Sequence, residues 1–163
     1  MSSSIIASSY QIHSPFEQVS LIVWQKAEYC PQIYATDVID RRVVNNKLHT
    51  TRLLTMQFKL PKILHFLTKD IHTYALEESI LDPKTMTLQQ HSVNMSLGDW
   101  FTCTEHIQYS KDGEITSFNS HADVTLSRSL ARMKQHFLVE FSKNAEKGQF
   151  AIEQALAATA FNK

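Results

Sequence analysis

Polar side chains interrupt two apolar patterns in this chain of 163 residues, and these side chains are the best candidates for chemistry. Alternation in residues 47–57 places Arg52 on the same face as Leu54, the more apolar of the two faces. A buried charge without a partner is costly, so Arg52 needs one. Two interpretations stay open. Arg52 either forms an internal ion pair with Glu77 or Glu78, or points into a cavity and receives an anionic headgroup.

A second polar anomaly lies near the C-terminus. Asn144 follows Phe141 by three residues and Phe137 by seven, which places it on the apolar side of a helical pattern. Lys147 lies almost one turn further on. Asn144 either satisfies a carbonyl at a strand end or lines a polar site, and Lys147 either reaches out to solvent or joins that site. The spacing alone is compatible with both roles.

The connection formed by residues 58–67 is unusually apolar and carries interleaved basic residues. It contains Phe58, Lys59, Leu60, Pro61, Lys62, Ile63, Leu64, His65, Phe66 and Leu67. One interpretation is a short buried helix that plugs one end of a sheet. The other is a mobile lid whose apolar side chains enter a bilayer while Lys59 and Lys62 meet the headgroups. Long apolar connections are more often functional than accidental, so this segment is the candidate membrane contact.

Other kinds of site find little support. The eight histidines include no His-x-x-x-His pair and no two at alternate positions of a strand, so we expect scattered histidines and no metal site. No nucleophile elbow or glycine-rich phosphate loop is present, so we expect no catalytic residue and no cofactor. Cys30 and Cys103 have neither zinc-ligand nor disulfide-framework spacing. Sixteen Lys and Arg balance sixteen Asp and Glu, which argues against a nucleic-acid binder.

Targeting signals are also weak. No apolar run approaches the roughly 18–20 residues that span a bilayer. The opening segment, MSSSIIASSYQIH, has no basic flank and no arginine, unlike a secretory signal or an ordinary mitochondrial transit peptide. We therefore expect a soluble protein, and the length suits one domain.

Periodicity predicts the elements that must position these residues. A strand is expected over 3–12 and a helix from Ser14 to about residue 27, where Ser-Pro-Phe-Glu matches a capping box. Three pairs of strands joined by short turns follow: 34–44 with 47–57, 71–81 with 85–96, and 100–110 with 114–126. Beyond Leu126, apolar residues recur at three- and four-residue steps as far as Leu156. We expect an α+β fold, a curved antiparallel β-sheet meander gripping a long C-terminal α-helix.

Short runs along the chain resemble the PRELI-like family, and most closely its Slowmo-type branch. They are Asp40-Arg41-Arg42, residues 47–54, Leu60-Pro61, residues 78–86, Asn94-Met95-Ser96, Glu105 and residues 142–148. The likeness extends over nearly the whole chain in one order. Residues 1–163 are therefore expected to form a single PRELI-like lipid-transfer domain.

This resemblance implies a START-like, phosphatidylinositol-transfer-like carrier and not an enzyme. Such proteins move phosphatidic acid or phosphatidylserine between the outer and inner mitochondrial membranes, touching each membrane transiently. They work in the intermembrane space as heterodimers with a small helical chaperone built on twin cysteine motifs. Import without a cleavable signal is compatible with that route.

The family's headgroup positions fall on Lys26, Arg52, Asn144 and Lys147, and its lid falls on residues 58–67. The chain departs from the family pattern at positions where some relatives carry a cation, namely Gln32, Met56 and Glu140. The smaller set of cations leaves the preferred headgroup open. The alternative function is a same-fold adaptor, small-ligand-binding protein or enzyme that does not transfer lipid.

Overall fold

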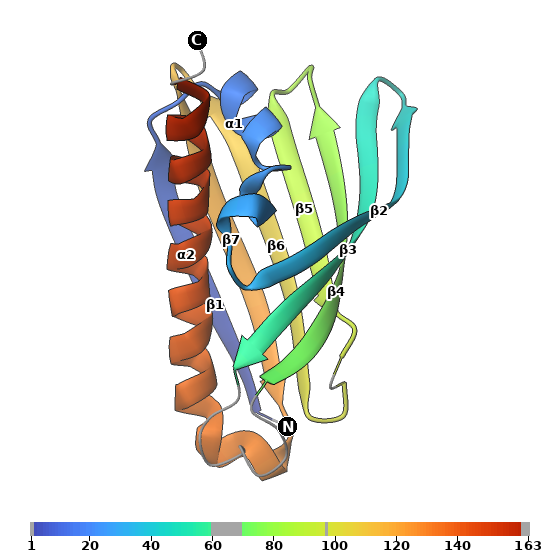
Figure 1. The fold of residues 1–163 in the computed structure, drawn as a ribbon, viewed down its shortest axis with the longest axis vertical. Helices are drawn as coiled ribbons and strands as arrows, with labels where there is room; N and C mark the ends of the chain where they lie inside the picture. The colour runs from blue at the N-terminus through green and yellow to red at the C-terminus, as the bar shows by residue number, and fades with distance from the viewer. Residues whose placement is uncertain (1, 60–69, 97, 161–163) are drawn as a thin grey trace.

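The structure is a computed structural model that describes residues 2–59, 70–96 and 98–160 (Figure 1). The elements follow in the order β1 (Ser2–Ile12), α1 (Phe16–Ile22), the 3-10 turn η1 (Lys26–Tyr29), β2 (Ile33–Val44), β3 (Lys47–Lys59), β4 (Asp70–Asp82), β5 (Thr87–Asn94), β6 (Phe101–Asp112), β7 (Ile115–Leu126), the 3-10 turn η3 (Arg128–Met133) and α2 (Lys134–Ala160).

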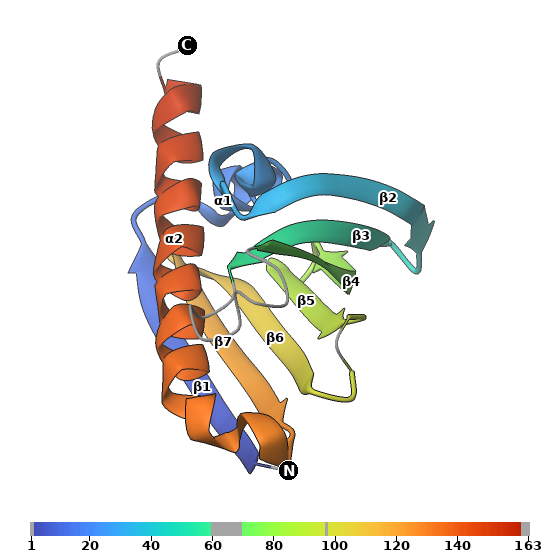
Figure 2. The ribbon, with the colours of Figure 1, turned by 60° about the horizontal axis from the view of Figure 1, so that its bottom comes forward.

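The described strands form one antiparallel sheet of seven strands in the order β1-β7-β6-β5-β4-β3-β2. Strands β2 to β7 pair with their sequence neighbours, as a meander requires, and β1 pairs with β7. The sheet is strongly curved, and α1 and α2 lie at its open side between the edge strands β1 and β2 (Figure 2). The predicted α+β fold, a curved meander with a long C-terminal helix, is confirmed.

Two of the tight turns follow from residues that tolerate unusual backbone conformations. Asn45 and Asn46 both adopt positive φ, 50° and 62°, as a two-residue hairpin of type I′ demands. Gly113 supplies the positive φ of 62° in the turn between β6 and β7. These turns set the register of their hairpins, and therefore which side chains face the interior.

The main core lies at the end of the concave face that α1 covers. Its buried members come from β1, α1, the middle strands and the C-terminal half of α2: Ile12, Phe16, Val19, Ile22, Val23, Leu88, Tyr109, Phe118, Ile152 and Ala155. Among the described side chains of α2, the buried ones are Ala151, Ile152 and Ala155. The side chains of Met133, Phe137 and Phe141, three members of the predicted apolar stripe, lie outside the described residues.

Both predicted helices differ from expectation at their first turns. Pro15 occupies the N-cap of α1 without a side-chain hydrogen bond, so the predicted capping box is wrong. The Glu17 carboxylate instead accepts a hydrogen bond from Lys111 Nζ of β6 at 2.9 Å, a tertiary contact that competes with the local cap. The 3-10 turn η3, with Ser127 as its N-cap, precedes the C-terminal helix, which begins at Lys134. No described helix has both the length and the hydrophobicity needed to cross a bilayer.

Candidate functional site

A cavity of about 280 Å³ lies between the concave face of the sheet and α2. All seven strands contribute to its wall, and η1, η3 and α2 complete it. Apolar side chains supply much of this lining, among them Ile6, Leu54, Met56, Phe101, Ile107 and Ile152. The volume lies just below the range of about 300–1,000 Å³ typical of small-molecule pockets.

Polar residues lie in two adjacent rows on the concave face of the sheet, and five of them line the cavity: Glu77, Gln90, Ser92, Glu105 and Ser120. Strand register aligns the first row through β3, β4, β5 and β6. It aligns the second through β3, β4, β5 and β7, with Ile107 at the β6 position between them. We call these residues the polar belt: Arg52, Glu77, Ser92 and Glu105 in the first row, and Thr50, Ser79, Gln90 and Ser120 in the second. Apolar residues border the belt on both sides, for example Leu54 and Ala75 beyond the first row and Leu88 and Phe118 beyond the second. The interior is therefore amphipathic rather than uniformly apolar.

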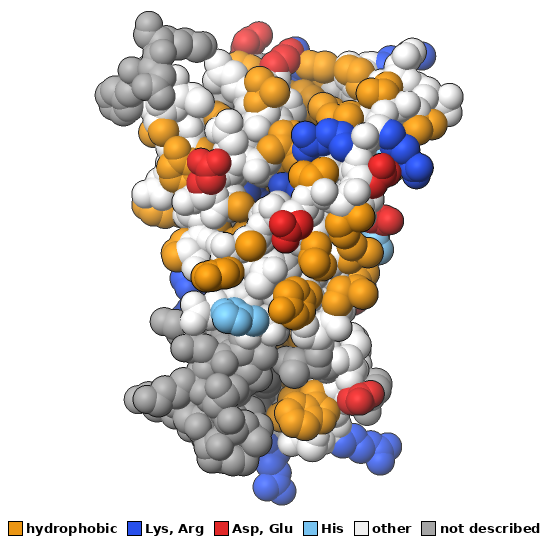
Figure 3. Space-filling model, turned by 45° about the vertical axis from the view of Figure 1, so that its right-hand side comes forward, with side chains coloured by type: hydrophobic (Ala, Val, Ile, Leu, Met, Phe, Trp, Pro, Cys, Tyr) orange, Lys and Arg blue, Asp and Glu red, His pale blue; other side chains and the backbone are white. Residues whose placement is uncertain are grey.

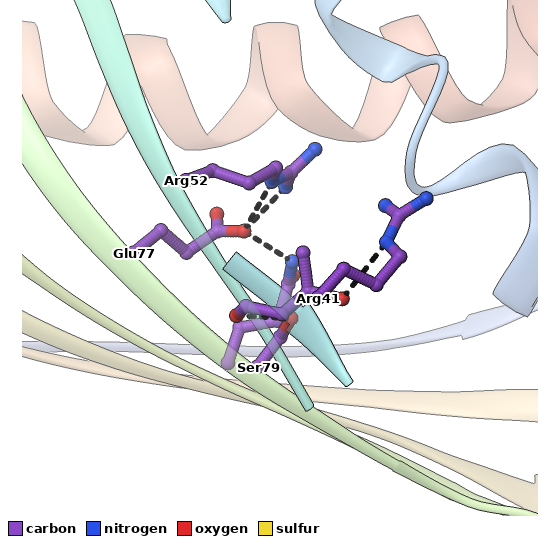
Figure 4. A network of polar contacts seen from close by, with 6 residues as sticks. Arg41, Arg52, Glu77 and Ser79 are labelled. Atoms are coloured by element: carbon purple, nitrogen blue, oxygen red, sulfur yellow. Dashed lines mark hydrogen bonds and ion pairs between the residues drawn. The ribbon is translucent and has the colours of Figure 1, made fainter. Parts of the chain in front are cut away.

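The belt contains a buried ion pair between Arg52 and Glu77 (Figure 4). Only 3% of Arg52 and 4% of Glu77 are exposed. Arg52 donates to Glu77 Oε1 from Nε at 3.0 Å and from a terminal guanidinium nitrogen, and Gln90 Nε2 donates to the same oxygen at 3.0 Å. The guanidinium also lies 4.8 Å from the ring centre of Trp24.

These contacts settle which carboxylate Arg52 pairs with. The first interpretation of Arg52, an ion pair with one of two carboxylates, is confirmed with Glu77 as the partner. Glu78 is exposed and faces the opposite side of β4. Arg52 itself is not among the described residues that line the cavity, whereas its partner Glu77 is. In this structure the guanidinium is held by Glu77 and lies over the ring of Trp24.

The remaining predicted headgroup residues fall in different places. Lys26 of η1 lines the cavity. Lys147 is exposed on α2 and is not among the described lining residues. Asn144 belongs to α2, but its side chain lies outside the described residues. The structure thus brings one predicted cation, Lys26, to the cavity wall and pairs another, Arg52, with the lining residue Glu77.

The predicted lid cannot be placed in the same way. Phe58 and Lys59 end β3, and their side chains lie outside the described residues. Leu60, Lys62, Ile63, Leu64, Phe66 and Leu67 lie outside the described residues altogether. The lid therefore stays a prediction.

Sequence reasoning did not place Gln90 or Tyr109 in a site and named Glu105 only within the family resemblance, yet all three line the cavity. A partial signal exists, because Leu88, Gln90 and Ser92 alternate along β5 and therefore share a face. The alternation along β5 does not predict which of its two faces points into the cavity. That assignment depends on the pairing of β5 with β4 and β6.

Three groups in the cavity wall, Cys103, Tyr10 and Tyr109, have pKa values above their usual range. Burial, followed by the negative charges of Glu105 and Asp123, raises the pKa of the Cys103 thiol to about 12. Burial is also the main reason that the pKa values of Tyr10 and Tyr109 lie above their usual range. At neutral pH these groups are a thiol and two phenols rather than nucleophilic anions. This arrangement suits ligand binding better than covalent chemistry.

Three histidines lie side by side on the convex face, so the expectation of scattered histidines is wrong for them. His91, His106 and His121 are aligned across β5, β6 and β7, although 15 residues separate each from the next. The rings of His91 and His106 stack with their centres 4.4 Å apart, and His121 Nε2 lies 3.4 Å from Asp123 Oδ2. Within the described chain, His, Cys, Asp and Glu side chains form no group of three that could hold a metal ion.

Comparison with known proteins identifies relatives along nearly the full chain. Residues 17–162 match the model of the PRELI-like family. The chain is 32% identical to UPS-like protein C36.10 of Schizosaccharomyces pombe, over 93% of this chain and 88% of that protein. It is 28% identical to PRELI domain-containing protein 1, mitochondrial, of Gallus gallus, over 90% of this chain and 73% of that protein.

Solved structures share the fold at much lower sequence identity. TTHA0849 from Thermus thermophilus superposes with a TM-score of 0.67 at 15% identity, covering 96% of this chain and 99% of that one. The Zhui aromatase/cyclase from Streptomyces sp. R1128 gives 0.63 at 12% identity, covering 94% of each chain. A START superfamily protein from Mycobacterium smegmatis gives 0.57 at 13% identity, covering 92% of this chain and 97% of that one. The fold is therefore START-like.

Proposed function

Because the chain belongs to the PRELI-like family, we propose that it is a carrier that holds a phospholipid between its sheet and α2 and transfers it between membranes. The observation that carries this proposal is the amphipathic cavity enclosed by all seven strands and α2. Each methylene that leaves water for such an interior contributes about 0.8 kcal/mol, so even a partly inserted acyl chain is held firmly. No bond is made or broken.

The proposed cargo is an anionic phospholipid, phosphatidic acid or phosphatidylserine, as the family resemblance implies. Lys26 is the cation that the described cavity wall offers to a phosphate. The same described wall also carries two carboxylates, Glu77 and Glu105, of which Glu77 is neutralised by Arg52. Asn144 and Lys147 remain proposed headgroup contacts on the strength of the resemblance. Arg52 would act through Glu77 rather than by touching the lipid.

Loading a phospholipid with two chains requires the cavity to widen beyond about 280 Å³. Ala151, Ile152 and Ala155 in the C-terminal half of α2 are buried, and Ile152 and Ala155 belong to the main core. Farther toward its N-terminus, Ala145 lines the cavity yet is exposed. We infer that the N-terminal half of α2 and the lid move away from the sheet at a membrane while the C-terminal half stays anchored. Transfer is then a shift between an open and a closed population.

The proposed setting is the mitochondrial intermembrane space, between the outer and inner membranes. The name of the Gallus gallus relative supports a mitochondrial location. A small helical chaperone with twin cysteine motifs is the proposed partner. The edge strand β2 offers a surface for it, since apolar side chains are exposed there (Figure 3): Tyr34, Val38, Ile39, Val43 and Val44.

Transfer between liposomes tests the proposed function. Donor vesicles carry fluorescent phosphatidic acid or phosphatidylserine, and acceptor vesicles carry none. The wild-type protein should move at least one of these lipids, and Lys26→Glu should slow transfer about tenfold or more by placing a negative charge beside the phosphate. Lys84→Glu makes the same charge change in an exposed turn outside the cavity and should leave the rate unchanged. Absence of transfer for both lipids, with and without a twin-cysteine partner, would refute the proposal.

The lid needs a separate experiment. Replacing Leu64 and Phe66 with Ser removes apolar area that the lid would insert into the bilayer, so liposome binding should weaken. Leu21→Ser is the matched control, because Leu21 is 69% exposed on α1. Equal liposome binding by the double variant and the wild type would exclude membrane insertion by this segment.

An enzyme with this fold is the second candidate, since one solved relative of the fold is an aromatase/cyclase. The interior weighs against it, because the Cys103 thiol has its pKa raised to about 12 and the pKa values of Tyr10 and Tyr109 are also raised. None of these groups is prepared to act as an anionic nucleophile or base at neutral pH. A carrier remains the better account.

A further inference from the structure

Two buried polar atoms on the floor of the cavity have no hydrogen-bond partner within the described chain. They are Gln90 Oε1 on β5 and the Tyr109 hydroxyl on β6. Gln90 is 3% exposed and Tyr109 is 0% exposed. Buried polar groups are paired with protein or ordered water in nearly all folded proteins, so a group inside the cavity completes these two: water in the empty protein and a ligand in the loaded one.

The orientation of Gln90 follows from its neighbour. An ionised carboxylate only accepts hydrogen bonds, so the amide nitrogen of Gln90 must be the atom that faces Glu77 Oε1 at 3.0 Å. The amide oxygen is then left over as an acceptor. Rotating the amide would exchange this bond for a repulsive contact with Glu77. Gln90 therefore presents an acceptor, and it needs a donor to satisfy it.

Glu105 adds a second acceptor to the same region. It lines the cavity on β6, where its Oε1 accepts a hydrogen bond from Ser120 Oγ at 3.1 Å. No described Lys, Arg or His side chain forms a salt bridge with it. Burial is the main cause of the raised pKa values of Tyr10 and Tyr109, and the Glu105 charge is one of the smaller contributions to both. Glu105 thus differs from Glu77, which Arg52 neutralises.

Strand register brings the three groups together. Gln90 pairs with Ile107, which lies between Glu105 and Tyr109 in the inward-facing positions of β6. Gln90 is therefore the diagonal neighbour of both, at roughly 7–8 Å between backbones, within reach of side chains of this length. All three side chains line the same cavity.

We propose that Gln90, Glu105 and Tyr109 form a second polar subsite that recognises a hydrogen-bond donor, a hydroxyl or an ammonium, on the ligand headgroup. The subsite rests on the proposed function, because it presumes a lipid in this cavity. A phosphate offers acceptors and negative charge, which Glu105 disfavours, so the phosphate belongs near Lys26 and the donor group at the subsite. The subsite would then select among phospholipids that share the same phosphate and acyl chains.

Lipid selection by the full-length protein tests this subsite. The protein is incubated with liposomes that contain equal amounts of phosphatidic acid, phosphatidylglycerol, phosphatidylserine, phosphatidylethanolamine and phosphatidylcholine with matched chains. Bound lipid is then quantified by mass spectrometry. Phosphatidylethanolamine and phosphatidylcholine form the decisive pair, since both are zwitterionic but only the former has N–H donors. The wild type should retain more phosphatidylethanolamine than phosphatidylcholine.

Two substitutions probe the subsite directly. Glu105→Gln removes the charge with little change of shape and should lower binding of donor-bearing lipids about tenfold relative to phosphatidic acid. Tyr109→Phe removes only the unpaired hydroxyl, so it should fold normally and lower the same ratio several-fold. If these variants lose binding only of phosphatidylserine and phosphatidylethanolamine, the group that the subsite recognises is an ammonium. If they lose binding only of phosphatidylglycerol, that group is a hydroxyl.

Matched controls make the same chemical changes outside the cavity. Glu78→Gln alters an exposed carboxylate on the convex face, and Tyr34→Phe alters a phenol that is 75% exposed on β2. Both should keep the wild-type lipid profile. If Glu105→Gln and Tyr109→Phe also keep it, the subsite is refuted while the carrier function stands. If the wild type retains none of the five lipids, the carrier function is refuted and the subsite with it.

Discussion

Arg52 on β3 and Glu77 on β4 face each other across the sheet and form an ion pair that is almost completely buried. Gln90 on β5 donates to the same carboxylate oxygen, and the Trp24 ring lies 4.8 Å from the guanidinium. Three strands and the segment after α1 therefore meet at one charge pair. Because Glu77 lines the cavity and Arg52 neutralises it, the pair supports the cavity wall.

Removing one member of this pair should be strongly destabilising. Arg52→Leu leaves the Glu77 carboxylate buried without a compensating charge, and Glu77→Leu does the same to Arg52. Each should lower the free energy of unfolding by about 3–5 kcal/mol, measured by urea denaturation. The double variant should lose far less than the sum, because neither charge is then stranded.

The exposed pair of Arg42 and Asp40 provides the control for that measurement. Their side chains are 69% and 49% exposed, and the two groups lie 3.4 Å apart. Arg42→Leu should change the free energy of unfolding by no more than about 1 kcal/mol. If Arg42→Leu and Arg52→Leu lowered the free energy of unfolding by similar amounts, burial of the Arg52–Glu77 pair would not be what makes it important for stability.

Stability should decline in alkaline solution. The pKa of Cys103 is raised from 9.0 to about 12 in the folded protein. Its contribution to stability is thus fully present below about pH 9 and is lost as the pH rises towards 12, because the unfolded chain ionises first. The pKa values of Tyr10 and Tyr109 are also raised in the folded protein, so these residues likewise lower the free energy of unfolding as the solution becomes more alkaline. Urea denaturation across this pH range should be carried out on the wild type and on Cys103→Ala. The free energy of unfolding of the variant should decline less steeply with pH. An identical decline in both proteins would exclude Cys103 as a cause.

Asp82 should titrate below its usual range. The hydrogen bond from Lys47 is the main reason that its pKa lies below 3.8. Asp82 Oδ2 lies 2.9 Å from Lys47 Nζ, and Oδ1 accepts from the backbone N–H groups of Lys84 and Thr85 at 2.9 and 3.3 Å. Its stabilising contribution is therefore present above pH 3.8 and lost as the pH falls through the lower folded pKa.

Carboxyl NMR titration of Asp82 checks this directly. Lys47→Ala should move the midpoint upward towards 3.8, because the main cause of the shift is gone. Lys84→Ala should leave the midpoint almost unchanged, since Lys84 contributes a backbone N–H that alanine keeps. Equal shifts in the two variants would show that the Lys47 side chain is not responsible.

The exposed apolar edge should make the isolated protein associate at high concentration. Val38 and Val43 of β2 are 53% and 70% exposed on an edge strand of the sheet. Val38→Lys with Val43→Lys should reduce self-association and partner binding in sedimentation velocity, with thermal stability nearly unchanged. Leu21→Lys adds charge at a residue that is 69% exposed on α1 and should have neither effect. Unaltered association of the β2 variant would exclude this edge as an interface.

Local pattern predicted much of the architecture because strand alternation and helical spacing are properties of neighbouring residues. The turn at Asn45 and Asn46 and the inward position of Arg52 follow from such short-range rules. The capping box at Ser14 is an exception, because Pro15 is the N-cap and the Ser14 N–H already donates to Ile12 O at 2.8 Å. Glu17 found a partner on β6, 94 residues away, and no local rule anticipates that.

The sequence by itself therefore determined which faces of the strands are polar or apolar, where the chain turns, and which family the chain resembles. The tertiary structure alone decided which polar residues meet. Glu77 and Glu78 are adjacent in sequence and point to opposite faces, so only the register of β3 with β4 could assign the partner of Arg52. The same register aligns His91, His106 and His121 outside and places Gln90 beside Glu105 and Tyr109 inside. Register depends on cooperative pairing along whole strands, so it cannot be predicted from any single segment of the sequence.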